Sequence, residues 1–93
     1  MNKLQIDGEI IFEEKIRHTP SGFVVQGFKI EHKSLQKEAN LDKKVGIEVD
    51  AVFINKQLRK EIQIGKKGLF TGFMDKKSFK STQLIFHVTE FKF

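Results

Sequence analysis

Five segments of the chain alternate apolar and polar residues with a period of two, the pattern of a half-buried β-strand. The segments are residues 3–12, 23–32, 45–54, 68–74 and 83–93. In the first, four apolar residues keep one phase, and Gly8 falls at a phase position where a bend or bulge belongs; the four are Leu4, Ile6, Ile10 and Phe12. In the third, one face is apolar from Val45 to Ala51, and Glu48 and Asp50 lie on the other. The pattern predicts an all-β chain.

Five strands without a long helix favour closure into a barrel. A flat sheet of five strands would leave two open edges and one uncovered apolar face. We therefore expect a single OB-fold domain over residues 1–93, with an SH3-like barrel as the alternative. In an OB-fold the ligand face is made by strands two and three, and the loops joining strands one to two and four to five form its rim. Two connections are less regular: residues 33–44 could hold a helical turn or be mobile, and residues 55–61 predict a short helical turn.

The bulk composition limits the class of protein. Ninety-three residues suffice for one modest core. The chain has ten phenylalanines and no Trp or Tyr, and because Phe has no polar group we expect most of the ten in the core. There is no apolar run long enough to span a membrane, and the start, MNKLQIDGEI, lacks a signal-peptide region, so we expect a cytoplasmic protein. The absence of cysteine excludes disulfides and thiolate metal sites.

Positive charge is concentrated in the second half of the chain. Residues 1–50 hold eight Lys/Arg and nine Asp/Glu, a net charge of −1, whereas residues 51–93 hold nine and three, a net charge of +6. Such asymmetry is typical of a chain that meets a polyanion, meaning nucleic acid or an anionic membrane surface. The alternative is a surface that serves solubility.

The connection between the last two strands combines cations with an aromatic ring. Asp75 to Thr82 carries Lys76, Lys77 and Lys80, with Phe79 among them. Lysines that contact phosphates, together with a ring on which a base can stack, are the elements of sequence-tolerant single-strand binding. The alternative is that Phe79 folds back to cap the barrel while the lysines are only solvated.

Other motifs predict no chemistry. His18, His32 and His87 have no spacing of a local metal-ligand pair, and a structural role at a strand end is expected for His32. The GKKG of residues 65–68 lacks the spacing of a phosphate-binding loop and is read as a turn. No catalytic Ser/His/Asp or paired-carboxylate arrangement has supporting context. We therefore expect neither an enzyme nor a bound metal or cofactor.

The block from Pro20 to Ala39, PSGFVVQGFKIEHKSLQKEA, resembles the primosomal replication protein N (PriB) family, small bacterial relatives of single-stranded DNA-binding protein. The start at Asn2 to Gly8 and the glycines of residues 68–73 are also similar to that family, so the resemblance runs through the whole chain. It implies an OB-fold homodimer that binds single-stranded DNA and acts in replication restart. It implies the primosomal helicase and other primosome proteins as partners.

The resemblance also implies a set of DNA-binding positions. Basic residues of the family lie near the end of strand one, after strand two and in the loop between strands four and five. The corresponding residues here are Arg17, Lys33, Lys43, Lys44, Lys76, Lys77 and Lys80. Family members can carry a tryptophan near the start of strand three, where this chain has Gly46, and an earlier aromatic position is Leu41.

Two other functions remain open at this point. A protein–protein adaptor could keep the barrel and lose most DNA binding, as the missing aromatic residues would allow. An RNA-binding barrel would satisfy the charge equally well.

Overall fold

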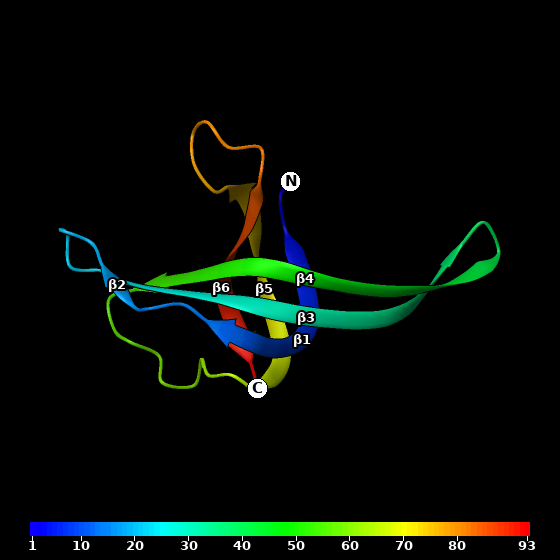
Figure 1. Ribbon diagram of the computed structural model, residues 1–93, viewed down its shortest axis with the longest axis horizontal. Helices are drawn as coiled ribbons and strands as arrows, with labels where there is room; N and C mark the ends of the chain where they lie inside the picture. The colour runs from blue at the N-terminus through cyan, green and yellow to red at the C-terminus, as the bar shows by residue number, and fades with distance from the viewer.

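The computed structural model describes residues 1–93 and contains six strands and no helix (Figure 1). Their bounds are β1 Leu4–Glu13, β2 Arg17–His18, β3 Val24–Glu38, β4 Leu41–Asn55, β5 Lys67–Lys76 and β6 Leu84–Lys92. Five of them form a closed barrel in the order β1-β5-β6-β4-β3, with β1 pairing back to β3. This order is that of the OB-fold, so the predicted fold is confirmed and the SH3-like alternative is set aside. No helix of the chain could cross a membrane.

The side chains on the apolar face of each predicted strand point inward and fill the barrel. The largest fully buried side chains come from four different strands: Ile10, Phe28, Ile30, Phe70 and Phe86. They belong to one hydrophobic cluster, against which Leu4, Ile6 and Val49 pack from the side. Burial of this kind contributes roughly 25 cal/mol per Å² of apolar surface removed from water, so the inward-facing residues of the strands stabilise the closed barrel.

The longest element is a hairpin in which β3 and β4 pair from Val24 to Glu38 and from Leu41 to Asn55. Ala39 and Asn40 alone make its turn, both with positive φ (52° and 64°), as a two-residue hairpin turn of the primed type requires. Residues 33–46, which we call the arm, project beyond the barrel at one end of the 50 Å long axis (Figure 1). The expectation of a helical turn or mobile segment at residues 33–44 is wrong, because cross-strand pairing continues to the turn.

Strand β1 departs from the predicted alternation near its end. Its register against β3 shifts between Ile10 and Phe12, and this bulge turns Phe12 outward, leaving it 48% exposed. Lys29 then lies over the ring, with Nζ 5.9 Å from its centroid. The prediction that Phe12 shares the inward face is therefore wrong. Gly8, where a bend or bulge was expected, is instead a close approach: a Cβ there would meet the Glu31 carbonyl oxygen and the Ile30 side chain.

The segment between β4 and β5 closes one end of the barrel without forming a helix. Its backbone makes turns, such as the bond from Ile62 N to the Arg59 oxygen (3.3 Å), so the predicted helical turn at residues 55–61 is wrong. Gln26 on β3 holds this segment: its amide donates to the Arg59 oxygen (3.0 Å) and accepts from the Arg59 nitrogen (2.9 Å). Ile62 is thereby seated in the core cluster.

Only four of the ten phenylalanines are buried, so the expectation that most lie in the core is wrong. The buried four are Phe28, Phe53, Phe70 and Phe86. Four others, Phe12, Phe73, Phe79 and Phe93, are exposed. The last two, Phe23 and Phe91, are half-buried, and Phe91 packs against the core cluster. A 93-residue barrel has an interior for few rings.

Candidate nucleic-acid interface

The loop of residues 77–83 joins β5 to β6 and extends from the barrel (Figure 1). The hydrogen bond from Lys77 N to the Gln83 oxygen (2.9 Å) closes its base. Phe79 near its tip is 91% exposed, so it does not cap the barrel. Lys76 donates to the Phe79 carbonyl oxygen (3.2 Å), and its Nζ lies 5.6 Å from the centroid of the ring. A cation and an aromatic face are thus presented together.

The three lysines of this region are not equivalent. Lys77 Nζ lies 2.6 Å from Asp50 Oδ2 on β4, and about a third of each side chain is exposed. Lys80 is exposed and makes no ion pair, and Lys76 contacts only the loop itself. Because Asp50 neutralises Lys77, the cations available to an anionic ligand here are Lys76 and Lys80.

The arm carries the second group of predicted residues. Side chains that lie directly opposite each other in an antiparallel pair share a face, and Lys33 opposes Gly46 while Lys44 opposes Leu35. Lys33 and Lys44 therefore lie on one face, separated by Gly46, where a Cβ would meet nothing within 4 Å. Lys43, the next residue along the strand, lies on the other face. The arm thus presents cations on both faces, with an open backbone patch at Gly46.

Arg17 lies apart from both groups. It belongs to β2, which pairs with Val24 and Val25 at the beginning of β3. Figure 1 shows β2 at the end of the molecule opposite the arm, with the 77–83 loop on a third side. The structure therefore brings Lys33 and Lys44 together, and Lys76, Phe79 and Lys80 together, but it does not join these groups or Arg17 into one patch.

Between the arm and the loop, the barrel surface is acidic. Glu9 on β1 opposes Glu31 on β3, and Glu31 opposes Glu48 on β4, so three carboxylates lie in a row across three strands. Like charges directly opposite each other are unfavourable, and only Lys67 and Lys33 approach the row, at 3.9 Å from Glu9 and 3.8 Å from Glu31. A phosphate chain would be attracted to the basic arm and loop and repelled by this row.

A chain of hydrogen bonds fixes the arm to β1. His32 Nδ1 contacts the Asp7 carbonyl oxygen (2.7 Å) and carboxylate (2.9 Å), and its Nε2 contacts Ser34 Oγ (2.8 Å). Gln36 donates to the same Ser34 oxygen (2.9 Å). His32 therefore uses both ring nitrogens to join the half of β1 that pairs with β5 to the base of the arm.

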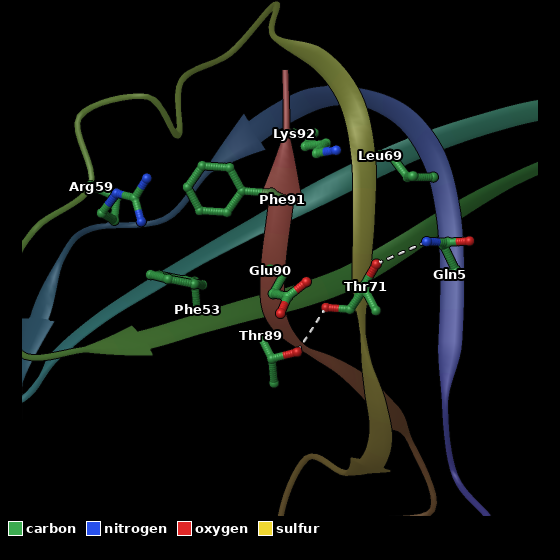
Figure 2. Close-up of a pocket in the computed structure, with 9 residues that line it drawn as sticks. All are labelled: Gln5, Phe53, Arg59, Leu69, Thr71, Thr89, Glu90, Phe91 and Lys92. Atoms are coloured by element: carbon green, nitrogen blue, oxygen red, sulfur yellow. Dashed lines mark hydrogen bonds between the residues drawn. The ribbon is translucent and has the colours of Figure 1, made fainter.

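A hollow of about 410 Å³ lies where β4 and β6 separate (Figure 2). Arg59 lies over the Phe91 ring at 4.7 Å and donates to Glu61 (2.8 Å). This bond lowers the pKa of the Glu61 carboxyl and raises the pKa of Arg59. Arg59 is thus already engaged by Glu61, and no predicted site residue lines the hollow.

Sequence reasoning missed one aromatic pair. Phe73 on β5 and His87 on β6 oppose each other and stack, with centroids 4.9 Å apart and planes at 2°. The two residues are fourteen positions apart, and only the register of β5 against β6 brings them together. The one available signal was that both residues lie equally far along the sequence from the centre of the basic loop, as residues that oppose each other in a hairpin do.

Fold and surface define the class: an OB-fold barrel with cationic side chains on a projecting hairpin and on the loop at its rim. Comparisons with known proteins identify the family within this class. Residues 2–90 match a family described as another single-strand binding protein family. The sequence is 35% identical over 91 residues to replication restart protein PriB of Nitrosomonas europaea, covering 96% of this chain and 84% of that protein.

Solved structures agree in fold. PriB from Ralstonia solanacearum superposes with a TM-score of 0.84 at 22% identity, over 99% of this chain and 97% of that chain. A single-stranded DNA binding protein from Thermus aquaticus, solved as a deletion mutant, gives 0.75 at 13% identity, over 99% of this chain and 49% of that chain. The chain belongs to the PriB family of single-strand-binding proteins. These are binding proteins and not enzymes, as the sequence predicts.

Proposed function

We propose that this protein binds single-stranded DNA without strong sequence preference and acts in replication restart. The observation that carries the proposal is the 77–83 loop, where Phe79 is 91% exposed beside Lys76 and near Lys80. An apolar ring that stays in water among cations is unfavourably hydrated and gains no packing contacts in the folded protein. Its exposure therefore favours a role in ligand binding. Membership of a single-strand-binding family supports the same reading.

In this proposal the strand is held at two places. The loop supplies Lys76, Phe79 and Lys80 at one end of the ligand face, and the arm supplies Lys33 and Lys44 at the other. Lys43, on the second face of the arm, contacts a strand that bends around the arm. Between loop and arm the strand passes the carboxylate row of Glu9, Glu31 and Glu48, which repels its phosphates. Lys77 contributes less because it is paired with Asp50. Arg17 contacts only a strand long enough to pass around the barrel.

The test is a titration of labelled poly-dT at two salt concentrations. Each phosphate neutralised on a single strand should contribute a slope of about −0.7 to log K against log salt. Binding that weakens steeply with salt, with duplex DNA of equal length binding less well, is the expected result. Tight binding to duplex DNA without binding to poly-dT would contradict the proposal.

The remaining features are proposed on the similarity to PriB. We infer a homodimer in the cytoplasm that works beside the primosomal helicase and stimulates it. Exposed apolar side chains support self-association, among them Ile16, Ile54, Leu58, Ile64 and Phe93. Sedimentation equilibrium at micromolar concentration tests the dimer, and a mass near the 10.8 kDa of one chain would exclude it.

A second candidate function is a primosome adaptor with weak nucleic-acid binding. The observation that favours it is the carboxylate row on the barrel surface, which repels DNA and could receive a basic segment of another protein. Poly-dT affinity that hardly changes with salt would favour this function. A poly-U strand that binds more tightly than poly-dT would favour RNA.

A further inference from the structure

We propose that Phe73, stacked on His87, forms a subsite for one nucleotide of a bound strand, with Lys3 placed to contact its phosphate. The inference rests on the proposed single-strand binding. It adds a binding subsite outside the loop and the arm, which the sequence did not predict. One face of the Phe73 ring is covered by His87. The ring is still 38% exposed, so its second face remains for a planar ligand.

A β-bulge makes the space beside this ring. In the β5–β6 ladder Thr71 opposes Glu90 while Gly72 opposes Val88, so Thr89 is an extra residue. Val88 is buried and both Thr89 and Glu90 are exposed, which places two consecutive side chains at the surface. Gly72 permits the register, because a Cβ there would strike the His87 carbonyl oxygen. The result is a hollow of about 380 Å³ with Phe73 in its wall.

The lining of the hollow has the chemistry of a nucleotide site. Phe73 offers a ring for stacking, Lys3 an exposed ammonium without an ion pair, and Glu90 an exposed carboxylate that can accept hydrogen bonds from base amino groups. Thr89 and Thr71 complete the wall, and the Thr89 hydroxyl donates to the Thr71 carbonyl oxygen (3.2 Å; Figure 2).

The position of the hollow is continuous with the basic loop. Asn2 fixes the beginning of the chain against β5, donating to the Met74 oxygen (2.7 Å) and accepting from the Met74 nitrogen (3.0 Å). Lys3 is thereby held beside Phe73. Phe73 is four residues before Lys77, about 13 Å along a strand. A strand that contacts the loop can therefore continue onto this ring without crossing the carboxylate row.

The experiment compares Phe73→Leu with Phe12→Leu, a matched change at another exposed ring that does not line the hollow. Anisotropy with an oligothymidylate of about 15 nucleotides, near the upper site size of an OB-fold, reports affinity. Phe73→Leu should weaken binding about fivefold or more, the effect of losing one base stack, and leave the salt slope unchanged. Phe12→Leu should bind like the wild type. On a strand of abasic sites with the same phosphates, Phe73→Leu and wild type should bind equally.

Different failures are distinguishable. If the wild type does not bind oligothymidylate, the proposed function itself is wrong. If the wild type binds and Phe73→Leu binds equally well, only the subsite is wrong. If Phe73→Leu changes the sedimenting mass, the face belongs to a second copy of the chain and the subsite is excluded. Should this variant not fold, proton NMR of the wild type decides: His87 ring signals should shift when the oligonucleotide is added, and unchanged signals would overturn the inference.

Discussion

Single side chains in this molecule replace backbone pairing where strands end. Gln26 makes both hydrogen bonds of a strand neighbour to the backbone of Arg59, and Asn2 does the same to Met74. A primary amide can imitate a peptide unit in this way because it carries one acceptor and donors in a fixed plane. These contacts hold an irregular segment and the chain start against the barrel.

Gln26→Ala should destabilise the fold. Gln26 is 6% exposed, and its loss leaves the Arg59 backbone groups without their partners. The expected decrease in the free energy of unfolding is about 1–3 kcal/mol, measured by urea denaturation. Gln57→Ala, at an exposed position in the same segment, is the control and should have almost no effect. Equal stability of the two variants would show that the amide does not hold the segment.

The loop lysines should differ in their effect on DNA binding. Lys80→Ala should flatten the salt slope by about 0.7, the contribution of one phosphate on a single strand. Lys77→Ala should flatten it less, because Asp50 already neutralises that ammonium.

Asp50→Asn is the complementary change. It should steepen the slope by up to about 0.7 by making Lys77 available. These slopes are measured by poly-dT titration across a salt series. If Lys77→Ala and Lys80→Ala prove identical and Asp50→Asn has no effect, the ion pair does not control the charge of the loop.

At the scale of elements, substitutions in the 77–83 loop can distinguish the contribution of stacking to DNA binding from that of charge. Phe79→Ala should weaken poly-dT binding by about 1–3 kcal/mol and leave the salt slope unchanged, because stacking releases no counterions. The thermal unfolding midpoint should not change, since the ring is 91% exposed. Affinity by anisotropy and midpoint by circular dichroism test both parts. A lower midpoint with unchanged affinity would assign the ring to packing.

The sequence predicted the strands better than their ends. Period-2 alternation located all five barrel strands because each buries one face, but it failed where a strand leaves the core. Residues 33–44 are polar on both faces, so nothing in their pattern distinguishes a projecting ribbon from a loop. Their hairpin is specified by pairing with each other and by the Ala39–Asn40 turn, which lacks the usual glycine.

The residues of the candidate site that lie in the 77–83 loop region could be predicted from the sequence. The contacts around them could not. Lys76, Phe79 and Lys80 are local in sequence, so their proximity needed no structure. The Lys77–Asp50 pair, the carboxylate row and the Phe73–His87 stack all depend on cross-strand register. One bulge, at Ile10 to Phe12 or at Thr89, changes which side chains meet, and the sequence does not mark either bulge.

At the scale of the whole molecule, two hairpins share one strand. The β3–β4 hairpin and the β5–β6 hairpin both pair with β1, which contacts β5 from Leu4 to Glu9 and β3 from Glu9 to Glu13. On the opposite side β4 and β6 pair at only two positions, Ala51–Phe86 and Val52–His87, in parallel. The line of weakest pairing in the barrel is therefore this β4–β6 seam.

We expect native-state hydrogen exchange to find the seam. Amides that bond across it should exchange through an opening of lower free energy than amides of the β3–β4 ladder at equal burial. The contrast is measurable by NMR, with the amides of the two seam pairs, Ala51–Phe86 and Val52–His87, compared with those of Phe28 and Ile30. Exchange of both sets at the rate of global unfolding would show that the barrel opens only as a unit.

The shared strand gives such an opening a definite mechanics. When the seam parts, the two hairpins stay attached to β1 and can swing only about the point where its partner changes, at Gly8 and Glu9. The barrel then acts as a cylinder slit along one side with a hinge along the other. Its circumference can widen only if the Lys77–Asp50 ion pair, which also joins the two hairpins, separates as well. The distance between arm and loop then changes with it.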